Sequence, residues 1–555
     1  MPATLSIKLD SLKPLAPLAQ LKAPNGGYPL AQTESADRYI ATGAWCALLS
    51  AKLLPAALRD RLVVACRYGA VRARAFEFAT AAFDRALARE IGEVKVDSID
   101  TIRRRRMLAE LAFDSEAMAT SSGDLYLATG VLDHLLTATR EAEGAGGWQD
   151  ALTWATRMVV ISPFDPRGYG RILNIANGAG QADVMQEVAN ILTAVNHYPQ
   201  MAAIFAATAA MKRGEAETCL AALAPLEDQI VKRDRVIAPL LGQIRVLRAT
   251  AHEKLGDFRL AYNFFVAMNR DEQSTVDPRN YYRKNDERER LKVPSLAHAD
   301  HHNVVQMVGF PRSGTTLLEN ALAAHPAIET FEEIPALRAA YAQLEQTQHS
   351  SAVTARMFQT ARQKYYEEID IRRRRDDAPV LVDKMPMRSG ESPLLVKLFP
   401  EWRYIFSIRH PFDVVLSCFK QRFKPNVAME NFRTIEDAVR LYDYTMTRWF
   451  QTFGMDDPRV CYVRYEELVL EFEKTLRRVL GFVGLEWDDA VTDFADAAAK
   501  RAARTPSYAK VRQGLGIGVQ TAWRNYDFIF DDKVADPLRK WAEKFGYDTD
   551  SRTDA

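Results

Sequence analysis

The stretch VVQMVGFPRSGTTLLENALAAHP, residues 304–326, predicts how the second half of the chain folds. Apolar residues lead into Gly309, Gly314 follows five positions later, and Thr315 and Thr316 then begin a run with helical spacing. A strand, a glycine-bearing turn and a helix in this order point backbone amides at an anion, and the helix dipole adds attraction. A nucleotide triphosphatase carries lysine where Thr315 stands. The loop is therefore expected to bind a phosphate-like group without that lysine.

Positive charge for this loop is expected from Arg312, whose planar guanidinium suits bidentate contact with a phosphate. The helix that follows offers Leu317, Leu318, Ala321 and Leu322 as a face to bury on a sheet, which holds the loop in place. A mere connection between strand and helix is the structural alternative. Two glycines, an arginine and a Ser/Thr/Thr cluster within eight residues favour the anion site.

Size and composition limit the class of protein. The 555 residues favour two or three domains, and 48% hydrophobic with 26% charged residues indicates a globular protein with ample core. The net charge of +1 gives no global field that favours nucleic acid or a membrane surface. Five scattered cysteines predict neither a disulfide framework nor a zinc site. Neither a secretory signal nor an apolar run of about 18 residues is found, so we expect a cytoplasmic protein without a membrane span.

The two halves of the chain differ in the spacing of their apolar residues. From about residue 35 to about residue 292, apolar residues recur at helical spacing, as in WQDALTWATRMVVIS, and strand-like alternation is rare. After RERLKVPSLAHADHHN, short β-branched or aromatic runs each precede a turn and a helix, at 304–308, 380–382, 404–408 and 460–463. This alternation predicts a parallel sheet covered on both faces. We expect a flexible segment over 1–34, an all-helical domain over 35–298 and an α/β domain over 299–550.

Glycines suggest a repeat in the helical half. Gly147, Gly180 and Gly214 lie 33 and 34 residues apart, Gly256 follows after a longer gap, and each precedes an amphipathic stretch. A period near 34 resembles the tetratricopeptide repeat, in which glycine permits the tight turn within each helical hairpin. An irregular helical bundle is the alternative. Both interpretations make this half a packing surface or a surface for a protein partner.

Two arginine runs, 103–106 and 372–375, invite a nucleic-acid interpretation. Both lie within longer helical stretches, and acidic residues such as Glu110 and Asp376 neighbour them. A solvated helix face explains such runs better than a nucleic-acid site does. We therefore expect no nucleic-acid partner.

The motif GFPRSGTTLLE is similar to the motif with which the sulfotransferase superfamily binds the 5′-phosphosulfate of 3′-phosphoadenosine 5′-phosphosulfate, the sulfuryl donor. The family places lysine or arginine two positions before the second glycine, where this chain has Arg312. The donor has no β- or γ-phosphate and requires no magnesium, so the resemblance implies no metal and accounts for the absent lysine. It also implies donor contacts from Ser313, Gly314, Thr315 and Thr316.

The family's second motif binds the donor's 3′-phosphate with an arginine at a strand end and a serine eight residues on. YIFSIRHPFDVVLSCF has Arg409 and Ser417 at that spacing. The pair can hold one phosphate only if the nucleotide lies across the strand tips, where ligands of open α/β sheets bind. VRYEELV resembles the adenine-side segment and TPSYAKVRQGLGIGVQTAWRNY the C-terminal donor loop, which implies contacts from Tyr465, Ser507, Arg524 and Asn525.

Sulfuryl transfer needs a base for the acceptor hydroxyl, in-line approach, and cations where negative charge develops on the oxygen that bridges sulfur and phosphate. Arg312 of the anion loop is one expected cation. The other is Lys384, which ends the run VLVDK, because tyrosylprotein-sulfotransferase-like enzymes place a matching lysine by the sulfuryl group. Those enzymes also carry a Glu-Glu pair whose first member is the base, which matches Glu332. Cytosolic sulfotransferases use histidine as base, and His325 and His410 are the alternatives here.

The resemblance thus implies an α/β P-loop sulfotransferase domain that moves the sulfuryl group to a hydroxyl of a protein tyrosine, a glycan or a small molecule. Pro335 stands where tyrosylprotein sulfotransferases carry an arginine after the Glu-Glu pair, which leaves the acceptor open. Two rivals are an atypical P-loop kinase, which predicts magnesium-dependent ATP binding, and a catalytically inactive helical-repeat scaffold.

Overall fold

The computed structural model describes residues 98–549, with gaps at 112–113, 130, 145–146, 162–165, 195–197, 232–239, 272–273, 295, 297–302, 348–354 and 494–521. The described residues form two compact units, one that ends at Asp257 and one that begins at Phe258. The predicted segment 1–34 lies outside them. Helices α14 (Phe258–Asp271) and α15 (Arg279–Glu289) belong to the second unit, whereas the change of sequence texture predicts a boundary near residue 298.

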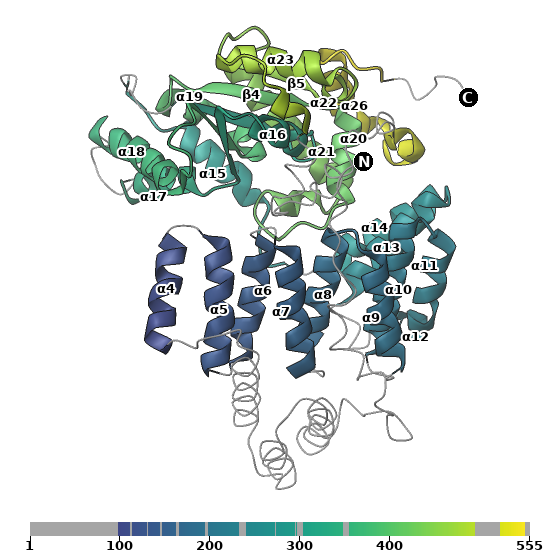
Figure 1. The fold of residues 1–555 in the computed structure, drawn as a ribbon. Helices are drawn as coiled ribbons and strands as arrows, with labels where there is room; N and C mark the ends of the chain where they lie inside the picture. The colour runs from purple at the N-terminus through teal and green to yellow at the C-terminus, as the bar shows by residue number, and fades with distance from the viewer. Residues whose placement is uncertain are drawn as a thin grey trace. The chain divides into compact units, whose positions relative to one another are not determined.

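The described residues of the first unit are helical, as their apolar spacing predicts, and successive helices stand side by side (Figure 1). The pairs α4 and α5, α6 and α7, and α9 and α10 are examples of neighbours in both sequence and space. The helices are α4 (Ile99–Leu111), α5 (Ser115–Thr129), α6 (Leu132–Gly144), α7 (Trp148–Ile161), α8 (Pro166–Gly178), α9 (Ala182–Ala194), α10 (Pro199–Arg213), α11 (Ala216–Leu223), η2 (Ala224–Leu226), α12 (Glu227–Val231) and α13 (Leu241–Lys254).

Glycines at the period near 34 lie in turns between paired helices. Gly180 and Gly214 have φ angles of 71° and 88°, a left-handed conformation that glycine adopts without a Cβ penalty. The amide of Glu215 then donates to the carbonyl of Ala210 at 2.9 Å, which satisfies an end carbonyl of α10 as the chain turns into α11. Packed helix pairs are therefore confirmed. Membership of the tetratricopeptide class stays a prediction.

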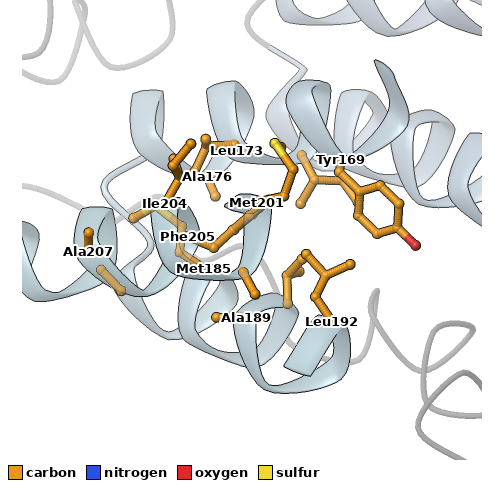
Figure 2. Close-up of a cluster of buried hydrophobic side chains, with 14 of the residues drawn as sticks. Tyr169, Leu173, Ala176, Met185, Ala189, Leu192, Met201, Ile204, Phe205 and Ala207 are labelled. Carbon is orange, nitrogen blue, oxygen red and sulfur yellow. The ribbon is translucent and has the colours of Figure 1, made fainter. Parts of the chain in front are cut away.

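The core of this unit is continuous from one helix pair to the next. Figure 2 shows Leu173 of α8, Met185 of α9, and Ile204 and Phe205 of α10 gathered between their helices. Ala189 lies among the large side chains, and such a small residue lets helices approach closely. Each helix thus buries apolar surface against its neighbours, which is how helical solenoids are stabilised.

The second unit is built on a five-stranded parallel sheet with the strand order β2-β3-β1-β4-β5. Four strands coincide with the predicted runs, and the sequence interpretation missed β2, the segment IETFE. β2 lies at the sheet edge and is short and polar, so its pattern is weak. The strands are β1 (Val304–Gly309), β2 (Ile328–Glu332), β3 (Val380–Lys384), β4 (Arg403–Ile408) and β5 (Val460–Arg464).

Helices cover both faces of this sheet, as predicted. On one face the buried leucines of α16 (Thr315–Ala323) share a core with Val305 and Met307 of β1 and with α23 (Phe472–Val483). On the other, Trp449 of α21 (Ile435–Thr452) packs on the rings of Tyr404 and Phe406 of β4. The remaining elements are α17 (Ala336–Thr347), α18 (Ala355–Arg372), η4 (Pro386–Glu391), α19 (Ser392–Leu398), α20 (Pro411–Phe419), η5 (Met429–Phe432), α22 (Tyr465–Leu470), η6 (Asp489–Asp493), η7 (Ala522–Ile529) and α26 (Asp532–Lys544).

Side-chain hydrogen bonds explain why α14 and α15 belong with the sheet. Asn269 of α14 is buried and donates to the carbonyl of Phe419 at 3.0 Å. Tyr281 of α15 donates to the carbonyl of Met387 at 3.1 Å. Among the described helices of the chain, none combines the length and the apolar character that a bilayer span requires.

A buried polar network lies beside the carboxyl end of β3. The Arg388 guanidinium contacts the carboxylate of Asp383 and donates to Gln306 Oε1 at 2.6 Å. Tyr365 donates to Asp383 Oδ2 at 2.7 Å. Because every member is buried, the opposite charges of Arg388 and Asp383 depend on each other.

Replacing Asp383 with asparagine is therefore expected to lower the free energy of unfolding by about 3 kcal/mol, because it leaves the Arg388 charge buried without its counter-charge. Urea unfolding followed by circular dichroism measures the loss. Asp377→Asn is the matched control, since that carboxylate is largely exposed and pairs with Arg375 at 3.4 Å. Similar losses in the two variants would show that the network contributes no more than a surface ion pair.

Candidate active site

The loop between β1 and α16 has the strained backbone expected of a binding loop. Arg312 has a φ angle of 72°, a value that residues with side chains rarely adopt. Gly314 has a φ angle of 94° and directly precedes the first turn of α16. A Cβ atom there would lie 2.4 Å from Cδ2 of Tyr465. The predicted strand, loop and helix are therefore confirmed, with an aromatic ring packed against the second glycine.

The two predicted donor motifs meet at the ends of β1 and β4. Arg312 Nε donates to Ser417 Oγ at 3.1 Å. Arg409 Nη1 donates to the carbonyl of Arg312 at 3.2 Å. The buried Cys418 thiol reaches the carbonyl of Pro311 at 3.3 Å, which ties α20 to the loop. Segments about 100 residues apart in the sequence thus form one site, because β1 and β4 are adjacent parallel strands.

This site gathers positive charge out of water. Burial lowers the pKa of Arg312, and the neighbouring Arg409 guanidinium opposes its charge further. Two such groups held close together favour an anion between or beside them. Ser313 Oγ and Arg409 Nε are buried and have no hydrogen-bond partner among the described residues. Unsatisfied buried donors of this kind fit a ligand with anionic oxygens.

Tyr465, the residue for which an adenine contact is predicted, lies beside both donor motifs. It begins α22 directly after β5. The Arg409 guanidinium lies over its ring, 4.9 Å from the ring centre. Because the same ring contacts the site of Gly314, the residue adjoins both predicted donor motifs.

Lys384 and Glu332 are brought together by strand register. They are partners in the β2–β3 ladder, and Lys384 Nζ lies 3.1 Å from Glu332 Oε1 and 3.2 Å from Glu333 Oε1. Burial opposes the charge of Lys384, but the carboxylates of Glu319, Glu332 and Glu333 outweigh it and hold its pKa well above the ordinary value. Lys384 is therefore a buried ammonium group, charged at neutral pH, beside the predicted base.

Glu319 is the residue of this cluster that the sequence interpretation missed. It lies on α16, and its Oε2 is 3.4 Å from Lys384 Nζ. The available signal was an acidic residue within the apolar face formed by Leu318 and Leu322. A carboxylate on a face that a helix buries needs a cation, and Lys384 is that cation.

The two histidines hold structural contacts. His325 Nδ1 accepts from the amide of Ala327 at 3.0 Å, so Nε2 carries the proton and donates to the carbonyl of Glu486 at 3.1 Å. His410 Nε2 lies 3.0 Å from the carbonyl of Asp548, and burial lowers the pKa of His410. These contacts give both imidazoles a role in packing.

Of the segment predicted as a C-terminal donor loop, the structure describes only the end. Ser507 lies outside the described residues, and Arg524 and Asn525 lie in η7. Arg524 Nη2 is 3.4 Å from Asp548 Oδ2, whereas Asn525 is exposed. The backbone amide of Trp523 donates to Asp413 Oδ1 at 3.1 Å, and Asp413 Oδ2 lies 4.0 Å from Arg409 Nη2. Through Asp413, η7 is thus tied to the Arg409 side of the site.

The fold and the site define an α/β domain of the P-loop class, with an anion site at the carboxyl ends of its strands. Residues 305–489 match the sulfotransferase family. The chain is 26% identical over 250 residues to protein-tyrosine sulfotransferase 1 of Danio rerio, covering 43% of this chain and 66% of that protein. It is 27% identical over 239 residues to an uncharacterized protein of Aquifex aeolicus, covering 40% of this chain and only 30% of that protein.

Among solved structures, the sulfotransferase domain from the Synechococcus PCC 7002 olefin synthase is similar over 46% of this chain and 100% of that chain, with 20% identity and a TM-score of 0.34. The family match and the sequence relatives show that residues 305–489 form a sulfotransferase-family domain of the tyrosylprotein-sulfotransferase-like kind, and an all-helical region precedes it. The family resemblance predicted from the loop motifs is confirmed.

Gly314→Ala tests the close packing of the loop. Both the left-handed backbone and the contact with Tyr465 oppose a side chain, so we expect binding of adenosine 3′,5′-bisphosphate to weaken by about tenfold or more, measured by calorimetry. Gly484→Ala is the control, because Gly484 has a φ angle of 85° with open space around its Cβ position, at the end of α23. Both variants are expected to lose stability, and only Gly314→Ala to lose affinity. Unchanged affinity in Gly314→Ala would exclude the loop from the binding site.

Proposed function

We propose that this protein transfers the sulfuryl group of 3′-phosphoadenosine 5′-phosphosulfate to an acceptor hydroxyl. The observation that carries the proposal is the meeting of the loop with the Arg–Ser motif, in which Arg312 Nε contacts Ser417 Oγ at 3.1 Å. A ligand with anionic groups at two ends of one adenosine suits two adjacent cationic motifs. Family membership of residues 305–489 implies the same donor.

The rival functions fit the site less well. A P-loop kinase needs a lysine that reaches the β- and γ-phosphates, and Thr315 occupies that position. An inactive scaffold has no use for a buried ammonium group surrounded by carboxylates beside an anion loop, yet Lys384 and Glu332 are held in register there. The paired donor motifs and the Lys384 cluster therefore both favour an active transferase.

The proposed chemistry assigns separate roles to cation and base. Arg312 and Lys384 stabilise negative charge that develops on the leaving oxygen, since both are buried where electrostatic interactions are strong. Glu332 accepts the proton of the acceptor hydroxyl. Its side chain is only 8% exposed, so the proton is taken in a site largely shielded from water.

We propose a phenolic hydroxyl, with a protein tyrosine as the first candidate, as the acceptor. A phenol ionises near pKa 10 and loses its proton to a carboxylate more readily than a sugar hydroxyl does. The Danio rerio relative, 26% identical over 250 residues, is a protein-tyrosine sulfotransferase by name. A protein acceptor also gives the helical unit a role as a docking surface.

The test mixes the purified chain with labelled donor and with separate pools of tyrosine peptides, glycans and small phenols. Formation of adenosine 3′,5′-bisphosphate with the peptide or phenol pool, in the presence of a magnesium chelator, is the expected result. Labelling of the glycan pool alone would contradict the acceptor assignment. No turnover with any pool, together with no bisphosphate binding by calorimetry, would overturn the function itself, and magnesium-dependent ATP binding would favour the kinase.

A further inference from the structure

Three carboxylates surround Lys384, and they differ in depth. The side chains of Glu319, Glu332 and Glu333 are 2%, 8% and 43% exposed, and that of Lys384 is 1% exposed. Glu319 is thus the deepest of the three and the only one that comes from the helix of the anion loop, α16. One ammonium group facing three carboxylates leaves an excess of negative charge, so the three have unequal tasks.

Glu319 connects the loop helix to β3. It lies five residues after Gly314, and Leu318 and Leu322 on the same helix are buried in the core shared with the sheet. Its Oε2 is 3.4 Å from Lys384 Nζ. A carboxylate at such a depth is unfavourable without a paired cation, so Glu319 and Lys384 constrain each other's position.

The catalytic cycle separates the roles of the carboxylates. When the base takes the acceptor proton, Glu332 becomes neutral and no longer balances Lys384. Glu333 is exposed enough for water and salt to screen its charge. The carboxylate that still balances the ammonium group, away from solvent, is that of Glu319.

We propose that Glu319 is a positioning residue that keeps the Lys384 ammonium charged and aligned with the anion loop while Glu332 exchanges its proton. The inference rests on the proposed function, in which Lys384 faces the sulfuryl group. Glu319 acts through Lys384 and takes no proton from the acceptor. The positioning geometry itself exists in the protein without any donor.

The direction of the pH effect follows from the groups that face Lys384. Among the described residues these are Glu319 from α16, Glu332 at the end of β2, and Glu333 just after β2. Burial lowers the pKa of Lys384, but the three carboxylates raise it by more, so the pKa lies above the ordinary value for lysine. Removing one carboxylate therefore lowers the pKa, so the ammonium group loses its proton at a lower pH.

The kinetic test compares kcat and bisphosphate affinity of Glu319→Gln with those of Glu329→Gln. We expect Glu319→Gln to lower kcat by about 30-fold at neutral pH, with bisphosphate affinity within about threefold of the parent. Glu329 is also a buried glutamate, but its carboxylate accepts from the amides of Arg374 and Arg375 at 2.8 and 3.1 Å. Glu329→Gln should leave kcat nearly unchanged. An unchanged kcat in Glu319→Gln would overturn the proposal.

A second test needs neither donor nor turnover, so it separates this inference from the proposed function. Trace acetic anhydride labels deprotonated amines, and peptide mass spectrometry measures labelling of Lys384 relative to the exposed Lys397. Glu319→Gln should raise relative labelling of Lys384 by about tenfold, which is one pKa unit, and Glu329→Gln should not. Equal labelling in parent and Glu319→Gln would refute the pairing even in an active enzyme. Were Glu319→Gln unable to fold, Glu319→Asp should give a smaller rise, and no rise would count against the proposal.

Discussion

Replacing Arg409 with alanine is expected to weaken binding of adenosine 3′,5′-bisphosphate by about 10³-fold, because truncating one partner of a buried charged contact costs several kcal/mol. Arg409 supplies a guanidinium group to the site and also donates to the carbonyl of Arg312 at 3.2 Å, so its loss removes charge and loosens the loop. The ring of Tyr465 beneath the guanidinium loses a partner as well. Calorimetric titration measures the affinity directly.

Arg403→Ala is the matched control for this experiment. Arg403 begins the same strand, β4, that ends just before Arg409. It donates to the carbonyl of Phe482 at 2.7 Å, on the side of the sheet away from the strand tips. We expect some loss of stability in Arg403→Ala and an unchanged affinity. Equal weakening of binding by the two variants would show that Arg409 acts through folding and not through the nucleotide.

Glu332→Gln is expected to reduce kcat by about 10³-fold while bisphosphate affinity stays within about threefold, because a glutamine of the same shape cannot accept the acceptor proton. The glutamine oxygen can still accept from Lys384 Nζ, which lies 3.1 Å from Glu332 Oε1 in the parent. The change therefore removes the base with little change of geometry. Turnover measured at saturating donor, beside calorimetry of the bisphosphate, separates the two effects.

Glu333→Gln decides which member of the Glu-Glu pair is the base. Glu333 also lies 3.2 Å from Lys384 Nζ, but its side chain is 43% exposed, far more than that of Glu332. We expect it to lose less turnover than Glu332→Gln. If Glu333→Gln were the more damaged variant, the roles of the two carboxylates would be reversed. If both variants lost affinity as much as turnover, neither would be acting as a base.

Local patterns predicted the frame of the sulfotransferase-family domain. Strands β1, β3, β4 and β5 are short apolar runs before turns, and the face of α16 is a repeated apolar spacing, so both are encoded by neighbours in the chain. β2 was not predicted because its sequence, IETFE, has only two large apolar residues. Its buried Glu329 accepts hydrogen bonds from the backbone amides of Arg374 and Arg375, which are distant in the sequence. Partners of that kind leave no trace in a local pattern.

Helices α14 and α15 show the same limit. Their apolar residues recur at the same helical spacing as in the preceding helices. This spacing predicts that one face of each helix is buried, but it does not predict which element packs against that face. Asn269 and Tyr281, bonded to the carbonyls of Phe419 and Met387, place these helices with the sheet. The compact unit therefore begins at Phe258, ahead of the change in texture near residue 298.

By itself the sequence determined a parallel α/β domain with a lysine-free anion loop, an Arg–Ser motif and a strand-end lysine, because each depends on residues close together in the chain. The contact of Arg312 with Ser417, and the convergence of Glu319, Glu332 and Glu333 on Lys384, arise only when the strands and helices pack together. Strand order and register set which side chains become neighbours, and the charge balance of a buried ammonium group depends on all of those neighbours together.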